Sequence, residues 1–93
     1  MNKIISYLGF ARKSNNIIIG QSSLKASRER IYLVIVCKTA SNNLKDLANH
    51  LAVKHNANVI ETNQPLSELL HLDNIKIIGI KDYNLSEAIK SAF

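Results

Sequence analysis

Cysteine, proline and glycine are all scarce in this sequence, with one, one and three residues respectively. The only cysteine, Cys37, lies within an apolar run, so we expect a buried thiol and no internal disulfide. No stretch approaches the roughly 20 consecutive apolar residues that a membrane-spanning helix needs. The first residues alternate apolar and polar side chains, which favours an amphipathic helix over a secretion signal. These features lead us to expect a cytoplasmic protein with no membrane contact.

The sequence also lacks the residue patterns of a metal centre or an active site. His50 and His55 are five residues apart, whereas two metal ligands on one helix face are four apart, and His71 has no cysteine pair beside it. Gly20 is followed neither by further glycines nor by a Gly-Lys-Ser/Thr ending, which excludes a P-loop and a dinucleotide-binding motif. We therefore expect no catalytic residue, no metal and no cofactor, and hence a protein that is not an enzyme.

What the chain does have is enough apolar residues for one core, and an uneven charge. Its 93 residues are 46% hydrophobic, which predicts a single domain over residues 1–93. The net charge is +5, with eight basic residues against one acidic residue in residues 1–45, and four against six in residues 46–93. A basic half is typical of proteins that bind polyanions, because neutralised phosphates release condensed counterions. An ordinary solvated surface with a positive excess is the alternative.

Hydrophobic spacing predicts the order of helices and strands. Apolar residues three and four apart predict core-facing helices, and the unbroken apolar run at residues 31–37 predicts a central strand covered on both faces. The predicted elements are a helix at residues 3–14, a strand at 17–19, a helix at 21–29, a strand at 31–37, a helix capped by Ser41 or Asn42, a strand from Val59, a short helix with Pro65 in its first turn, a strand at 75–80 and a helix capped by Asn84. Because helices and strands alternate, we predict an α/β fold: a three-layer α-β-α sandwich with a central sheet of about four strands.

The segment after the first predicted strand has two interpretations. A helix that begins just after Gly20 turns free N–H groups outward, and Lys25, Arg28 and Arg30 follow within ten residues. This arrangement suits a phosphate-rich ligand. The alternative is a strand-to-helix turn that needs glycine for its geometry, with Ser22 as the helix cap.

The order of short motifs resembles a known family. The sequence reads "LGFARKSNNIIIG", then a short helix with a lysine, then "YLVIVCKTASNN" and later "ANVIET". This order resembles the ribosomal-protein family that binds kink-turn RNA, the L-seven-Ae and L-thirty-e type, and most closely its small bacterial YlxQ-like members. The matches run from about Leu8 to Glu61, with weaker agreement up to the C-terminus. The resemblance implies an α-β-α sandwich with a mixed sheet, and a ribosomal or other structured RNA as partner within a ribonucleoprotein.

The resemblance also implies where RNA would bind. In this family the turn that opens the second helix contacts the sheared G·A pairs of a kink-turn, and the loop after the V-I-E strand packs on a flipped-out nucleotide. The first of these elements falls on Gly20, Gln21, Ser22, Ser23 and Lys25, and the second on Glu61, Thr62, Asn63, Gln64 and Pro65. Phosphates would be neutralised by Arg12, Lys13, Lys25, Arg28, Lys38 and Lys45. We expect these cations and the turn after Gly20 to share one surface.

Some residues depart from the family pattern. Ser22 and Ser23 stand where the family has Asn and Glu, and serine is too short for two-point recognition of a guanine edge. Lys25 comes one residue earlier than in the pattern, and residues 69–72 lack its glycines. Two hypotheses follow. The leading one is a non-catalytic RNA-binding protein, and the alternative is a protein-interaction adaptor that has lost kink-turn recognition and exposes an apolar patch near Leu69 and Leu70.

Overall fold

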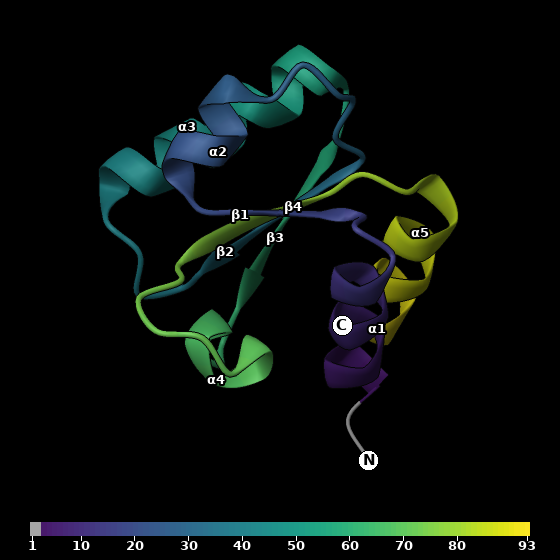
Figure 1. The fold of residues 1–93 in the computed structure, drawn as a ribbon. Helices are drawn as coiled ribbons and strands as arrows, with labels where there is room; N and C mark the ends of the chain where they lie inside the picture. Colours follow the sequence, from purple (N-terminus) through teal and green to yellow (C-terminus); the bar gives the residue numbers. More distant parts are fainter. Residues whose placement is uncertain (1–2) are drawn as a thin grey trace.

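The computed structural model describes residues 3–93, in which helices and strands alternate along the chain (Figure 1). The elements are α1 (Lys3–Lys13), β1 (Ile17–Ile19), α2 (Gln21–Ala26), β2 (Leu33–Cys37), α3 (Asn42–His55), β3 (Asn58–Thr62), α4 (Leu66–Leu70), β4 (Ile77–Ile80) and α5 (Tyr83–Ala92). Every element predicted from hydrophobic spacing is present, in the predicted order. Within these residues, no helix combines the length and the apolar character that crossing a membrane requires.

The four strands form one mixed sheet in the order β1-β4-β2-β3. The strand β4 runs antiparallel to both of its neighbours, β1 and β2, whereas β2 and β3 are parallel. Helices α2 and α3 cover one face of the sheet, and α1, α4 and α5 lie on the other (Figure 1). The predicted three-layer α-β-α sandwich is confirmed.

The core is centred on β2, whose five residues are all buried. This burial agrees with the prediction of a strand covered on both faces, because β2 has strands on both sides and helices above and below. On the α2 side the covering is close: a Cβ atom added at Gly79 in β4 would lie 2.7 Å from Cδ2 of Leu24 and 3.2 Å from Cγ2 of Ile31. Glycine at this position allows α2 to pack directly on the sheet.

Several element ends differ from the sequence predictions: α1 ends one residue earlier, β2 and β4 each begin two residues later, and Pro65 is the N-cap of α4 and not part of its first turn. Two further differences, at the end of α2 and the start of α5, have a visible cause. The second helix ends at Ala26 instead of residue 29, because Ser27 is extended and its hydroxyl accepts a hydrogen bond from the N–H of Glu29. The last helix is capped by Asp82, which accepts a hydrogen bond from the N–H of Leu85, and not by Asn84. In both places a local hydrogen bond ends or begins the helix where hydrophobic spacing gives no signal.

The long helix α3 begins and ends as its sequence indicates. The Ser41 hydroxyl accepts a hydrogen bond from the N–H of Leu44, which makes Ser41 and not Asn42 the cap. Asn56 ends the helix in the left-handed conformation, with φ of 55°. Ala48 and Leu51 are buried against the sheet.

Candidate functional site

The candidate site lies at one end of the sheet, where three strands finish and a fourth begins. Because β1, β2 and β3 run in the same direction and β4 runs against them, their carboxyl ends meet the start of β4. Three backbone hydrogen bonds tie this end together: Gly20 N–H to Ile77 O (3.1 Å), Cys37 N–H to Lys76 O (2.9 Å) and Lys38 N–H to Thr62 O (2.9 Å). Both segments that the family resemblance indicated, after β1 and after β3, therefore lie at this end.

The turn at Gly20 needs glycine, because its φ of 91° lies in a region that other residues rarely adopt. Gly20 is the N-cap of α2 without any side-chain cap, so the predicted capping by Ser22 is wrong. Gln21, Ser22 and Ser23 follow with exposed side chains. A shallow hollow of about 200 Å³ adjoins the turn, lined by Gly20, Gln21, Leu44, Asn74, Lys76 and Ile77.

Two exposed lysines lie between the turn and the loop after β3. Lys38 follows the last residue of β2, and Lys76 precedes the first residue of β4. Sequence reasoning named Lys38 but missed Lys76, as well as Asn74 beside it. No local signal points to Lys76, since it lies in the more acidic half of the chain and joins the others only because β4 pairs between β1 and β2. We define the strand-end surface as Gly20, Gln21, Lys38, Asn63, Asn74 and Lys76.

The loop after β3 is shaped mainly by a buried threonine. Thr62 is 2% exposed, and its hydroxyl donates a hydrogen bond of 2.7 Å to the backbone oxygen of Gln64. Its side chain therefore holds the loop and is not accessible to a ligand, which corrects its place among the predicted contact residues. Asn63 and Pro65 are exposed, and Pro65 is the N-cap of α4. Gln64, between them, is also exposed.

Glu61, the last acidic residue before this loop, faces the α3 side of the sheet. Its carboxylate lies 3.9 Å from Nζ of Lys45, and both side chains are partly exposed. Lys45 is therefore paired with an acidic side chain of the protein itself, and Glu61 has Lys45 as its ion-pair partner. Neither side chain belongs to the strand-end surface as defined above.

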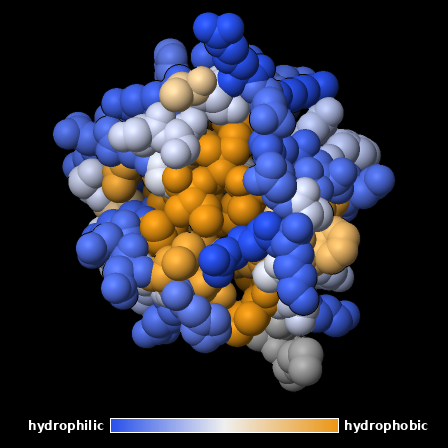
Figure 2. All heavy atoms as spheres, viewed as in Figure 1, coloured by the Kyte–Doolittle hydropathy of each residue, from blue (hydrophilic) through white to orange (hydrophobic). Residues whose placement is uncertain are grey.

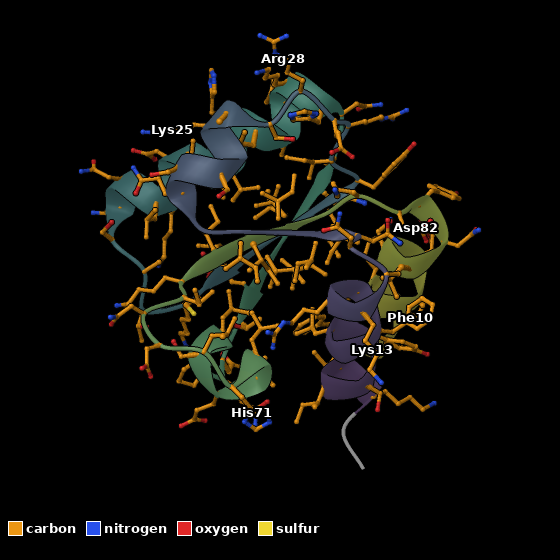
Figure 3. The ribbon with its side chains drawn as sticks, viewed as in Figure 1. Phe10, Lys13, Lys25, Arg28, His71 and Asp82 are labelled. Atoms are coloured by element: carbon orange, nitrogen blue, oxygen red, sulfur yellow. The ribbon has the colours of Figure 1, made fainter. Side chains whose placement is uncertain are left out.

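The remaining predicted cations do not gather on the strand-end surface. Arg28 lies in the loop that leads to the start of β2, at the opposite end of the sheet. Lys25 is in the last turn of α2, on the same side of the sheet as Arg28, whereas Lys13 extends from α1 on the other side (Figure 3). Arg12 donates a hydrogen bond of 2.9 Å to the backbone oxygen of Leu70 and so caps the end of α4. The expectation that all these cations share one surface with the turn is wrong, because Arg28 lies at the opposite end of the sheet and Lys13 extends from α1. Arg12 adjoins the turn only at Ser23, with which it lines a separate hollow.

The side chains that commonly bind metals or act as nucleophiles are not gathered at one place in the described residues. Among residues 3–93 there is no cluster of three or more histidine, cysteine, aspartate or glutamate residues that could hold a metal ion. Cys37 is 3% exposed, and its sulfur accepts a hydrogen bond of 3.2 Å from the N–H of Leu66. Tyr32 is half-buried under the guanidinium of Arg30, 4.6 Å from its ring centre, and so supports the opposite end of the sheet.

Comparison with known proteins bears on the fold. No family model and no curated protein matches the chain. Among solved structures, a protein with unknown function from Bacillus halodurans superposes with a TM-score of 0.84 over 99% of this chain and 97% of that chain, at 21% sequence identity. The likeness shows the fold alone. The same α/β arrangement therefore occurs in a second protein whose sequence is only 21% identical.

Proposed function

We propose that the chain is a non-catalytic RNA-binding protein that contacts structured RNA through the strand-end surface. One observation carries the proposal. The backbone hydrogen bonds of Gly20, Lys76 and Lys38 bring the two segments named by the family resemblance to a single end of the sheet, with two exposed lysines between them. The segments are about three strand spacings apart, roughly 14 Å, which is a distance that a folded RNA backbone bridges.

The chemistry of the surface suits RNA better than a small acidic ligand. Lys38 and Lys76 supply positive charge for phosphates, and neither has an ion-pair partner among the described residues. Gln21, Asn63 and Asn74 carry amide groups that both donate and accept, as contacts to base edges and 2′-hydroxyl groups require. Lysine positions the phosphates, and the amides add selectivity.

A kink-turn RNA, ribosomal or other, is the RNA class that the resemblance favours. The short side chains of Ser22 and Ser23 cannot hold a guanine edge at two points, so we assign base contacts to Gln21 instead. The buried thiol of Cys37 requires no oxidising compartment, and a cytoplasmic, ribosome-associated setting is part of the proposal. The alternative is an adaptor that has lost kink-turn recognition. Its expected apolar patch is not at Leu69 and Leu70, since both are buried.

A titration at two salt concentrations tests the proposal. A kink-turn oligonucleotide is compared with one that lacks the G·A pairs, and we expect tighter binding to the former and a steep loss of affinity with salt. Lys38→Gln and Lys76→Gln should each lower affinity several-fold and reduce the salt slope by about one. Lys54→Gln, which removes an exposed lysine from the far end of α3, is the matched control and should bind as the unaltered chain does.

Two results would contradict the proposal. One is an absence of binding to any structured RNA at low salt. The other is an equal loss of affinity in Lys54→Gln and in the two strand-end variants, because binding would then follow net charge and not this surface.

A further inference from the structure

The outer edge of β1 has no strand paired with it among residues 3–93. This strand is first in the order β1-β4-β2-β3, so β4 is its only neighbour in the sheet. Two hydrogen bonds, Gly20 N–H to Ile77 O and Lys81 N–H to Asn16 O, fix the even-numbered residues as those that bond to β4. Antiparallel ladders alternate, so Ile17 and Ile19 direct their N–H and C=O groups away from the sheet. Four backbone groups are thus available to a further strand.

A groove runs along this edge. It is a hollow of about 400 Å³ between the end of α1 and the start of α2, lined by Arg12, Asn15, Ile17, Ile18, Ile19 and Ser23. The three isoleucines are half-buried and pack against the core without being covered by it. Figure 2 shows an apolar surface in the middle of this face, bordered by polar side chains, at the place where β1 crosses the front of the molecule in Figure 1.

The side chains of β1 present apolar surface on both sides of the edge. Ile18 is paired with Gly79, whose missing side chain leaves room for Leu24, so Ile18 shares the face covered by α2. Ile17 and Ile19 alternate with Ile18 and belong to the face of α1. A strand added to this edge would extend both faces of the sheet.

The charge around the groove selects the occupant. Arg12 lines the groove, and Lys13 lies with Arg12 and Gly9 in the adjoining hollow, while no acidic residue lines either one. A second copy of this chain would bring its own Arg12 to the same edge and add its own net charge of +5. An acidic strand would be attracted by the same field that repels a second copy.

We propose that the β1 edge binds an extended peptide segment of a partner protein, in which aliphatic and acidic residues alternate, by strand addition. Backbone hydrogen bonds to Ile17 and Ile19 give affinity. The aliphatic side chains extend the α2 face beside Ile18, and the acidic side chains extend the α1 face, where Arg12 and Lys13 attract them. The inference does not depend on RNA binding, because the β1 edge and the strand-end surface share no residue.

Amide hydrogen exchange measured by NMR tests this register directly. The probe is a short capped peptide in which valine and glutamate alternate. In the free protein we expect fast exchange at Ile17 and Ile19 and slow exchange at Ile18, whose N–H bonds to β4. Added peptide should slow exchange at Ile17 and Ile19 and leave Ile18 unchanged. A peptide with alternate backbone nitrogens methylated, and one with lysine in place of glutamate, should both fail to protect these amides.

Variants separate this edge from the strand-end surface. Arg12→Gln keeps a donor for the backbone oxygen of Leu70 but removes the charge, and should weaken peptide binding several-fold. Lys54→Gln is the control that removes one charge elsewhere, and the double variant Lys38→Gln/Lys76→Gln should bind the peptide normally. An unchanged NMR spectrum outside the altered residue verifies that each variant is folded.

Three outcomes would overturn the proposal. The first is that neither amide is protected at any peptide concentration. The second is that both are already protected in the free protein and become exposed on dilution, which would identify a second copy as the occupant. The third is that kink-turn RNA protects these amides while the acidic peptide does not.

Discussion

The backbone N–H of Ile31 donates a hydrogen bond of 3.2 Å to Nδ1 of His55, and so ties the segment that leads into β2 to the last residue of α3. Because Nδ1 accepts, the proton of the neutral ring is on Nε2. That nitrogen is buried and has no hydrogen-bond partner among residues 3–93. His55 therefore serves the fold in its neutral form.

Stability should fall below neutral pH because of this histidine. Desolvation by burial, followed by the charges of Lys54 and Arg30, lowers the pKa of His55. As the pH falls below the ordinary histidine value of about 6.5, the unfolded chain takes up a proton that the folded chain resists, so the free energy of unfolding decreases until the folded pKa is reached. Urea unfolding at pH 8 and at mildly acidic pH measures the difference. The loss of stability at acidic pH should be smaller in His55→Gln and unchanged in His50→Gln. The same pH dependence in the unaltered chain and in both variants would contradict this role of His55.

Gly79→Ala should destabilise the protein by about 1–3 kcal/mol. The new methyl group would lie 2.7 Å from Cδ2 of Leu24, which is buried and cannot move aside freely. Gly9→Ala is the matched control, because a methyl group there meets no atom within 4 Å and alanine favours the helix by about 1 kcal/mol. Thermal unfolding compares the two variants. If Gly79→Ala were as stable as the unaltered chain, the packing of α2 on β4 would be looser than described.

Asp82→Ala should cost about 1 kcal/mol of stability, since it removes the oxygen that accepts from the N–H of Leu85 at 2.7 Å. Asn84→Ala should be nearly neutral, because Asn84 lies within the first turn of α5 and is exposed. The two variants differ only in which polar residue is lost near the start of α5. If chemical unfolding showed a larger loss of stability in Asn84→Ala than in Asp82→Ala, Asn84 would be the cap.

Cys37 should react with a thiol reagent only after unfolding. Its side chain is 3% exposed and its sulfur accepts the N–H of Leu66, so a bulky disulfide reagent cannot reach it in the folded protein. The rate at which Cys37 reacts with the reagent, compared with and without urea, measures its accessibility. Cys37→Ala should destabilise the fold by about 1–3 kcal/mol, because the N–H of Leu66 loses its partner in a buried place. Rapid labelling without urea would argue against the described burial.

Much of the fold was predictable because the relevant signals are local. The apolar run at residues 31–37 identified the central strand, and the spacing of Ala48 and Leu51 identified α3. Two of the errors lie where one hydrogen bond decides a helix end, at Ser27 and Asp82. Hydrophobic spacing is insensitive to such bonds, because they involve polar residues just outside the periodic pattern.

The candidate site was predictable only in part. The family resemblance led to Gly20 and to residues 61–65, but the sequence placed Arg12 and Arg28 beside them, and the structure places these two elsewhere. Lys76 was missed altogether. Charge counted along the chain ignores the connections between strands, and these connections decide which cations are neighbours.

By itself the sequence determined the kinds of elements and their order, since the alternation of apolar and polar residues selects helix or strand within a few residues of each position. Only the tertiary structure decided that β4 lies between β1 and β2. That pairing joins residues more than forty positions apart, and it depends on how all the apolar faces are buried together and not on any one segment. It brings Lys76 beside Gly20 and leaves one edge of β1 without a paired strand among residues 3–93.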